Sequence, residues 1–197
     1  TLEPGAQARD LLTGTEIART PGFGVAGGAT WTPDGTGVTF AATLNRDQSA
    51  YADVIRSLFL VPAAGGEPRR LTLDSADYGG AEFSPDGRAL YAQMTPNNGR
   101  IHNNSRLVMW DWPAMGAARV VTGGADRSVG ATAFSPDGRT VYFSAEDASH
   151  VKLFRVPGGG GAAAEVGQLT TGTIAAFDVG GTAAAPVIAG IWESAVN

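Results

Sequence analysis

The sequence contains no cysteine, which excludes disulfide bonds and thiolate metal sites. It has two histidines, His102 and His150, and their spacing does not suggest the three or more ligands of a zinc site. No apolar run approaches the roughly 18 residues that a membrane-spanning helix needs. Basic residues number 14 against 19 acidic ones, and a net charge of -5 argues against a nucleic-acid-binding surface. We therefore expect no metal, cofactor, nucleic acid or membrane span. The bacterial cytoplasm and the periplasm are both compatible with this composition.

Glycine and proline, by contrast, are abundant, with 28 and 11 of 197 residues. This composition favours many short strands joined by turns over a helical protein. The length suffices for one domain with an ample core. Because the chain begins with Thr1 rather than Met, we expect it to be a piece of a longer protein.

One short motif occurs three times. Ser135-Pro136-Asp137-Gly138 has near copies at residues 84–87 and 32–35, and apolar segments flank each copy. Proline fixes φ at the second turn position, aspartate hydrogen-bonds the local backbone, and glycine accepts a positive φ. The motif therefore predicts a tight turn between two strands. Its prolines are separated by 52 and 51 residues, which makes it a marker of an internal repeat.

Two further elements recur with the turn. A compact apolar run appears at residues 58–61, 107–110 and 153–156. A closing pair, Leu-Thr or Val-Thr, occurs at residues 12–13, 71–72, 121–122 and 169–170. After each turn glycine, apolar residues alternate with a period of two, which is typical of a strand. Each unit thus predicts four short antiparallel strands in about 40–50 residues, the dimensions of a propeller blade.

We therefore predict an all-β fold in which residues 1–197 form part of one β-propeller, with three full blades and two partial ones. The predicted units are the closing strand of a preceding blade (1–17), three blades (18–72, 73–122 and 123–170) and a partial blade (171–197). Residues 176–181 stand where the next turn motif belongs, as a degenerate copy. An open propeller would expose two apolar blade faces and unpaired edges, so we expect self-association. Alternatively, the two partial blades complete each other in a four-bladed ring.

Two glycine- or serine-containing segments resemble catalytic motifs but lack the required context. Residues 22–27 match G-x-G-x-x-G, yet no room remains for the helix that must follow, so we interpret them as a link between blades. Residues 126–130 resemble the nucleophile elbow G-x-S-x-G, but Asp126 replaces the first glycine. We expect a structural role there, in which Asp126 and Arg127 form a local ion pair, or a place facing the central channel.

Polar loops are the best candidates for binding. Residues 43–56 and 95–106 are long and polar, whereas residues 146–150 form only a short loop in the third unit. Loops at one end of a rigid scaffold commonly carry function, and these two should emerge on the same face. The charged side chains suited to peptide termini are Arg46, Arg100, Arg106, Asp126 and Arg127. Both histidines are interpreted as solvated loop residues. The recurring aromatic residues are interpreted as core: Trp31, Phe40, Phe59, Phe83, Phe134, Phe143 and Phe154.

The repeated pattern resembles that of known propellers. The pattern consists, in order, of Phe-Ser-Pro-Asp-Gly-Arg, an apolar strand, Leu-Phe-x-Val, Gly-Gly and Arg-Arg-Leu-Thr. It is similar to the WD40-like repeats of TolB-type proteins and of the prolyl oligopeptidase (S9) family of serine peptidases. Residues 124–130, followed by residues 143–147, resemble a late blade of bacterial dipeptidyl and acylaminoacyl peptidases. Residues 66–72 and 100–107 also resemble that group, and the resemblance covers essentially the whole chain.

The resemblance implies a propeller that sits over an α/β-hydrolase domain with a Ser, Asp and His triad. No G-x-S-x-G occurs in this sequence, so the resemblance places no catalytic residue here. It implies a non-catalytic segment that gates and docks peptide substrates, with the hydrolase domain of the same parent protein as its partner. Two alternatives stay open: a TolB-like protein interaction module, and a propeller attached to an amidohydrolase.

Overall fold

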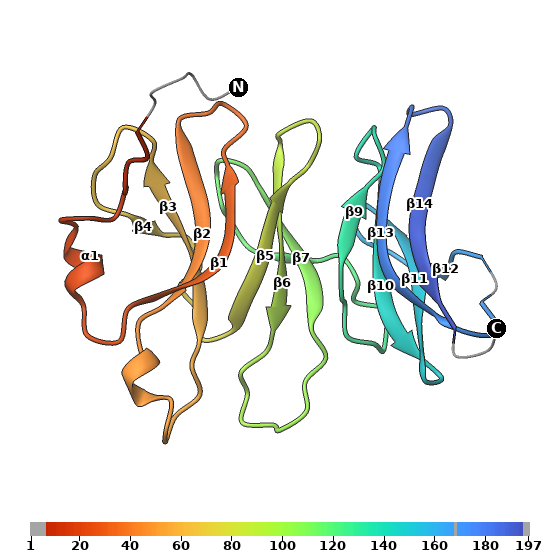
Figure 1. The fold of residues 1–197 in the computed structure, drawn as a ribbon, viewed down its shortest axis with the longest axis horizontal. Helices are drawn as coiled ribbons and strands as arrows, with labels where there is room; N and C mark the ends of the chain where they lie inside the picture. Colours follow the sequence, from red (N-terminus) through yellow and green to blue (C-terminus); the bar gives the residue numbers. More distant parts are fainter. Residues whose placement is uncertain (1–6, 168, 195–197) are drawn as a thin grey trace.

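The computed structural model describes residues 7–167 and 169–194, which form four antiparallel sheets (Figure 1). The first sheet contains β1 (Gly24–Trp31), β2 (Gly37–Thr43), β3 (Arg56–Pro62) and β4 (Arg69–Arg70). The second contains β5 (Asp77–Phe83), β6 (Ala89–Thr95), β7 (Arg106–Asp111) and β8 (Arg119–Val120). The third contains β9 (Thr132–Phe134), β10 (Thr140–Asp147), β11 (His150–Pro157) and β12 (Ala164–Glu165). The fourth contains only β13 (Thr173–Gly181) and β14 (Pro186–Glu193).

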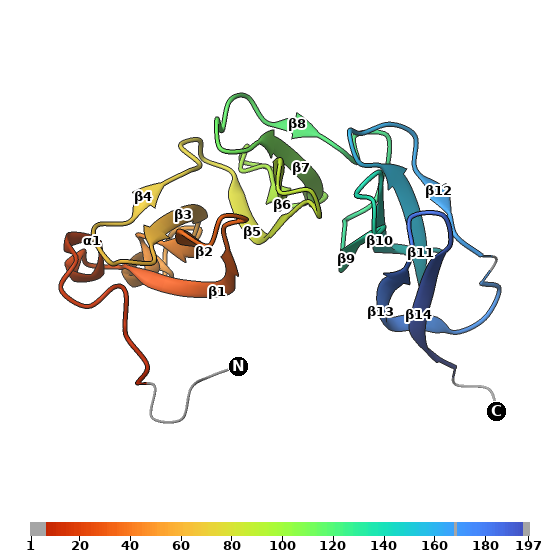
Figure 2. The same ribbon diagram turned by 90° about the horizontal axis from the view of Figure 1, so that it is seen from above.

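The sheets stand side by side in an open arc, with the first strand of each on the concave side (Figure 2). In every sheet the strand order follows the chain, so each unit is an up-and-down antiparallel meander. The predicted all-β class with four-stranded units is confirmed. The first and fourth sheets lie at opposite ends of the arc, so within this chain the partial units do not close a four-bladed ring (Figure 2).

Helices are minor elements of this fold. A one-turn helix α1 (Glu16–Arg19) precedes the first sheet, and a 3-10 turn η1 (Arg46–Gln48) lies in the loop after β2. In the described parts of the chain, no helix is long and apolar enough to cross a membrane.

The Pro-Asp-Gly turns have the same geometry in all three full sheets. The hydroxyl of Ser84 donates to the Asp86 carboxylate at 2.6 Å and accepts the Ala89 N–H at 3.0 Å. The same carboxylate accepts the N–H of Arg88 at 3.1 Å. Equivalent bonds recur around Thr32 with Asp34 and around Ser135 with Asp137. The hydroxyl before proline, which the sequence interpretation left without a role, thus closes the hairpin together with the aspartate.

Successive turns also pack on one another. A Cβ added to Gly87 would lie 2.7 Å from the Cβ of Pro33, and one added to Gly138 would lie 3.2 Å from the Cδ of Pro85. The turn glycines of the second and third sheets therefore contact the turn proline of the preceding sheet. Gly35, in the first sheet, has open space at the same position.

The closing strands β4, β8 and β12 are two residues long, and the sequence analysis misplaced the third closing pair. Leu71 donates its N–H to the carbonyl of Leu58, and Val121 donates to that of Leu107. In the third sheet the equivalent donor is Val166, which bonds Leu153, so the predicted closing pair at residues 169–170 is wrong by three residues. The error arose because this sheet has glycine rather than threonine after the apolar residue.

Two other expectations are corrected. Residues 22–27 are not simply a link between blades, because Gly24 begins β1, whose register against β2 is interrupted by bulges. Glycine tolerates such bulges, with φ of +107° at Gly27 and +69° at Gly28. Residues 176–181 lie within β13 rather than in a turn, and the hairpin turn follows, where Thr182 and Ala185 bond each other.

The core consists of three apolar clusters, each lying against one face of a sheet. One joins the second and third sheets and includes Tyr91 packed edge-on against Phe134 at 4.8 Å between ring centroids. Another joins the first and second sheets through residues such as Leu58 and Leu90. Phe40, Phe59, Phe134, Phe143 and Phe154 are buried as predicted, and Phe83 is partly buried. Trp31 is exposed, contrary to the prediction.

The third cluster caps the first sheet with the chain's own N-terminal segment. Leu11, Leu12, Ile17 and Phe23 pack against a face that contains Phe40, Phe59 and Val61. In the second and third sheets the corresponding face packs on a preceding sheet. The expectation of two exposed blade faces therefore fails at this end, although Val25 and Trp31 of β1 stay exposed. Residues 7–15 contain no strand, so their assignment to a preceding blade stays a prediction.

Candidate functional site

The two long loops emerge on the same face of the arc, as predicted from the sequence. Residues 44–55 and 96–105 both extend from the lower edge of the view in Figure 1. The third sheet has only a tight turn there, in which Ala148 and Ser149 adopt positive φ. The links that lead into β5 and β13 arrive at this end as well, since Asp77 pairs with Thr95, the last residue of β6. We call this face, with residues 44–55, 71–77 and 96–105, the loop face.

A recurring hydrogen bond joins adjacent sheets at the loop face. The backbone N–H of Arg56 donates to the Asp77 carboxylate at 2.8 Å. The equivalent N–H of Ser105 donates to the Ser128 hydroxyl at 3.2 Å. Between the third and fourth sheets, Val151 donates in the same way to the Thr173 hydroxyl at 2.9 Å. Ser128, the residue in the elbow-like segment, is thus a structural acceptor between sheets.

The first of these junctions is reinforced by an ion pair. The Arg56 guanidinium donates to Asp77 from Nε at 2.9 Å and from Nη2 at 2.5 Å. The hydrogen bond with Asp77 raises the pKa of Arg56. Gly79 lies beneath this pair, where a Cβ would be 3.3 Å from Arg56 Nη1. The arrangement joins the first two sheets, from which both long loops extend.

The local ion pair expected between Asp126 and Arg127 is not formed, because each residue has another partner. Arg127 donates to Asp147 at 2.7 Å and lies over the ring of Phe154, 5.1 Å from its centroid. Hydrogen bonds, first from Arg127 and then from Lys152, hold the pKa of Asp147 below its usual value. Asp126 instead accepts a hydrogen bond from Asn104 at 3.3 Å, which ties the second loop to the third sheet. The geometry gives both residues structural partners.

Arg46, Arg100 and Arg106 are exposed, and their side chains form no hydrogen bond or ion pair with other described residues. The backbone around Arg100 is ordered by Asn98, whose carboxamide oxygen accepts the Arg100 N–H, and by Asn103, which donates to the Arg100 carbonyl. Of the five residues predicted from the sequence, these three have cationic groups available to a ligand. The structure does not bring them into one pocket.

Arg100 lines a cavity of about 290 Å³ between the two long loops. Asp53 from the first loop, Asn103 from the second and Asp77 from the sheet junction share its wall. The cavity therefore offers one free guanidinium beside carboxylates and amides. Sequence reasoning missed Asp53, Asp77 and Asn103, because their proximity depends on how the two sheets meet.

Large apolar side chains are exposed around the same loops. Tyr51 is 80% exposed, Leu73 is 81% exposed and Ile101 is 93% exposed. They come from the first loop, the link into β5 and the second loop, respectively. Because exposed apolar groups gathered at one end often mark a binding surface, the loop face is the best candidate for contact with a partner.

The two histidines have different environments. His102 is exposed in the second loop, as predicted. His150 is not a solvated loop residue, because it begins β11 and its Nδ1 lies 2.7 Å from the Gly172 carbonyl. It lines a cavity of about 600 Å³ with Ser149, Thr173 and Glu193. Within residues 7–167 and 169–194, no cluster of three or more His, Asp or Glu side chains could hold a metal ion.

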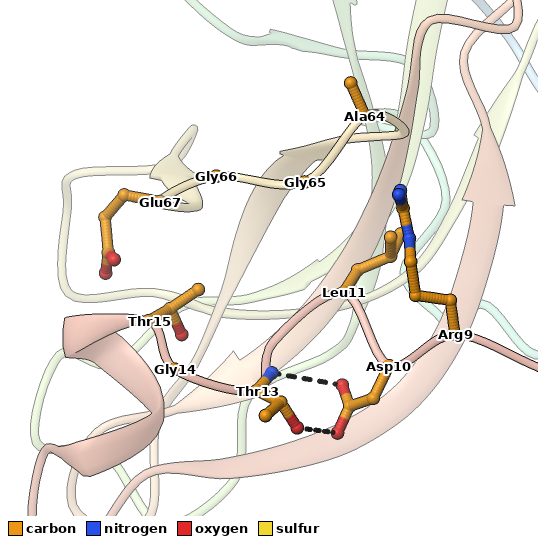
Figure 3. Close-up of a pocket in the computed structure, with 10 residues that line it drawn as sticks. All are labelled: Arg9, Asp10, Leu11, Thr13, Gly14, Thr15, Ala64, Gly65, Gly66 and Glu67. Atoms are coloured by element: carbon orange, nitrogen blue, oxygen red, sulfur yellow. Dashed lines mark hydrogen bonds between the residues drawn. The ribbon is translucent and has the colours of Figure 1, made fainter.

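A separate hollow of about 350 Å³ lies where the N-terminal segment meets the turn after β3 (Figure 3). Asp10 accepts hydrogen bonds from Thr13, and Arg9 donates to the carbonyl of Ala63. Glu67 accepts the N–H groups of Glu16 and Ile17 at 2.8 and 2.7 Å, which caps the start of α1. These bonds attach the N-terminal segment to the first sheet, so the hollow has a structural origin.

Comparison with solved structures identifies propellers. The propeller domain of the Trilobed protease from Pyrococcus furiosus, which has an open velcro topology, matches with a TM-score of 0.60 and 16% identity, over 85% of this chain and 45% of that one. TolB from Acinetobacter baumannii matches with a TM-score of 0.54 and 17% identity, over 85% of this chain and 40% of that one. The fold is that of a β-propeller. A puromycin-hydrolysing peptidase from Mycobacterium tuberculosis matches with a TM-score of 0.59 and 19% identity, over 75% of this chain and 24% of that one.

These likenesses support the fold and not a function. The chain spans less than half the length of each of the three structures. No family model matches the chain, and no curated protein sequence matches it. The propeller fold is therefore shared with both TolB and peptidase propellers.

Proposed function

We propose that this chain is a non-catalytic propeller segment of an S9-type serine peptidase, which docks and gates peptide substrates for an α/β-hydrolase domain of the same parent protein. The observation that carries the proposal is the loop face, where unpaired arginines stand beside exposed apolar side chains. Peptides offer carboxylate groups and apolar side chains in an extended, accessible form. Arginine binds carboxylates through two parallel hydrogen bonds, which suits Arg100 at the mouth of its cavity.

Gating by this scaffold would be geometric. A rigid arc that carries its long loops on one face admits short or flexible peptides and excludes folded proteins by size. The role needs no nucleophile, which agrees with the absence of G-x-S-x-G from the sequence. The first test is therefore a hydrolysis assay of the 197-residue chain with dipeptide and tetrapeptide p-nitroanilides. We expect no turnover, and turnover by the purified chain would contradict a non-catalytic role.

The second test measures docking directly. A fluorescein-labelled pentapeptide with a free C-terminus is titrated with the chain and followed by fluorescence anisotropy. Arg100→Gln should weaken binding about tenfold or more, because a hydrogen bond to a charged group contributes about 1.5–3 kcal/mol. Arg88→Gln, at the opposite turn end, is the matched control and should bind like the parent chain. Amidation of the peptide's C-terminus should weaken binding to the parent chain by a similar factor. Docking at Arg100 would be contradicted if Arg100→Gln bound the peptide as tightly as the parent chain, and if the amidated peptide bound as tightly as the free one.

The alternative function is a TolB-like module that binds a protein partner without an attached enzyme. The exposed side chains of Tyr51, Leu73 and Ile101 favour it, because large apolar anchors are typical of protein interfaces. The gene around this segment distinguishes the two. A G-x-S-x-G after a predicted strand supports the peptidase, whereas a different domain supports the module.

A further inference from the structure

Two opposite charges line the cavity between the long loops, and neither has a partner among the described residues. Asp53 stands on the first loop and Arg100 on the second, and both belong to the wall of the cavity of about 290 Å³. Neither side chain forms a hydrogen bond or an ion pair with another described residue. The third charged residue of the wall, Asp77, is already paired with Arg56. One carboxylate and one guanidinium are therefore available to a ligand.

The backbone that carries these two charges is held by asparagine side chains. On the first loop, Asn45 donates from Nδ2 to the carbonyl of Asp53 at 2.8 Å. On the second loop, the carboxamide oxygen of Asn98 accepts the N–H of Arg100 at 3.2 Å, and Asn103 donates to the Arg100 carbonyl at 3.2 Å. Both loops are thus ordered at their charged residue before a ligand binds, which lowers the entropic cost of binding.

Four other residues of the cavity wall are apolar. Val54 and Ile55 come from the first loop, and Pro96 and Ile101 come from the second. Asn97 shares the wall, and its carboxamide has no hydrogen-bond partner among the described residues. Such a wall suits a ligand with apolar side chains and a peptide group. Because ligand sites usually measure about 300–1,000 Å³, this cavity is at the small end of the range and favours a short ligand.

We propose that the cavity binds a short apolar peptide of dipeptide size in its zwitterionic form, with the ammonium on Asp53 and the carboxylate on Arg100. The inference rests on the proposed function, because it takes Arg100 as the group that binds a peptide carboxylate. It adds that the amino end of the peptide is bound in the same cavity. A zwitterion brings one charge of each sign to a site that offers one of each, so ligand and cavity are complementary in charge.

This arrangement selects peptides by their length. Each further residue of an extended chain adds about 3.3–3.6 Å between the two ends, so a longer peptide cannot place both ends in one small cavity. An internal segment of a polypeptide has neither charge to offer. Since hydrogen bonds between ionised groups are about twice as strong as neutral ones, the two ends contribute most of the specificity.

Isothermal titration calorimetry of the 197-residue chain tests the two ends of the ligand separately. The ligands are the dipeptide Leu-Leu, its N-acetyl form and its C-terminal amide. We expect each blocked form to bind about tenfold or more weaker than Leu-Leu, because each lacks one charged hydrogen-bonding group. The tetrapeptide Leu-Gly-Gly-Leu keeps both charges and both side chains but separates its ends by up to about 7 Å more. It should bind no better than a blocked dipeptide.

Substitutions assign each end to its residue. Asp53→Asn should weaken the binding of Leu-Leu about tenfold or more but leave that of the N-acetyl form unchanged, since this form has no ammonium to lose. Arg100→Gln should weaken the binding of Leu-Leu but leave that of the amide unchanged. Asp47→Asn lies on the same loop as Asp53 but outside the cavity wall, so it is the matched control and should bind every ligand like the parent chain. Circular dichroism checks that each variant keeps its fold.

The inference would be overturned if Leu-Leu did not bind, or if the N-acetyl form or Leu-Gly-Gly-Leu bound as tightly as Leu-Leu. An Asp53→Asn variant that bound Leu-Leu like the parent chain would overturn it as well. In these cases the effect of Arg100→Gln on the labelled pentapeptide would still support docking through the carboxylate. Failure of the proposed function is a different result, in which neither Arg100→Gln nor amidation changes the binding of the pentapeptide.

Discussion

At the scale of single residues, the turn motif has two tasks. Within a sheet, hydroxyl and aspartate close the hairpin through bonds repeated three times. Between sheets, the glycine fits against the preceding proline, most closely where Gly87 meets Pro33. Turn chemistry predicted the part of the aspartate in the first task but not that of the hydroxyl. It could not predict the second, because the contact joins residues that lie more than 50 positions apart and depends on how the sheets stack.

Comparing two glycines isolates the contact between turns. Gly35 and Gly87 have φ of +70° and +69°, so alanine at either position incurs the same backbone strain, about 1–2 kcal/mol. Only Gly87→Ala also places a Cβ against Pro33, for which overpacking adds about 1–3 kcal/mol. We expect Gly87→Ala to lower the free energy of unfolding in urea by that additional amount relative to Gly35→Ala. Equal losses would show that the turns do not support each other.

The turn aspartates also predict a dependence on pH. Hydrogen bonds, first from the neighbouring hydroxyl, hold the pKa values of Asp34, Asp86 and Asp137 below the usual value. A carboxyl whose pKa is lower in the folded state stabilises the protein above its unfolded pKa, near 4. That contribution is lost as pH falls through the folded pKa values. We expect the melting temperature to decrease when the pH is lowered below about 4. A triple Asp→Asn variant, which keeps the acceptor oxygens but does not ionise, should show a flatter profile.

At the scale of secondary structure, the closing strands depend on side chains as much as on the backbone ladder. β4 and β8 are only two residues long, and the threonine two positions after each extends the sheet. Thr72 accepts the N–H of Leu58 at 3.0 Å, and Thr122 accepts that of Leu107 at the same distance. These hydroxyls replace backbone carbonyls that a longer strand would supply.

Removal of the Thr72 hydroxyl should therefore be costly. Thr72→Val keeps the shape but leaves the buried N–H of Leu58 without a partner, which costs about 1–3 kcal/mol. Thr72→Ser keeps the hydroxyl and should lose less. Chemical denaturation of the two variants provides the comparison, and a valine variant as stable as serine would contradict the role given to the hydroxyl.

The elements themselves were largely predictable, because alternating apolar residues and turn chemistry are local signals. The third strands, such as β7, and the two long loops follow the expected ranges. The strand β1 was not expected at residues 24–28, since its glycines hide the alternation. The candidate site was predictable only in part. Arg100 is a feature of its loop, but the partners of Arg127 and Asp126 come from other strands and loops, which no local pattern reveals.

At the scale of the whole molecule, the two ends of the arc are unlike. The N-terminal end is covered by Leu12, Ile17 and Phe23, and Glu67 anchors the segment through the start of α1. The other end presents the apolar edge of β14. Among the described residues, the first sheet is thus covered by the chain's own segment, whereas β14 of the fourth sheet pairs only with β13.

Deletion of the N-terminal segment tests the first of these ends. Without residues 1–23, the buried rings of Phe40 and Phe59 would face water, and each ring contributes about 1.5–3 kcal/mol by its burial. We expect a lower unfolding free energy and stronger binding of a hydrophobic dye such as ANS. Deletion of residues 1–6, which leaves Leu11 to Phe23 in place, is the comparison, and we expect the longer deletion to change both measurements more. Normal stability after the longer deletion would show that the segment is not a cap.

The stacked turns have a consequence for how such an arc can change in length. The second sheet has both halves of the contact, because Pro85 meets Gly138 of the sheet that follows and Gly87 meets Pro33 of the sheet that precedes. The two halves of the contact are carried by the same four-residue motif, so every duplicated unit brings its own connectors. Gene duplication or loss of one unit would therefore leave complementary surfaces on either side of the change, with no compensating substitution needed at the turns.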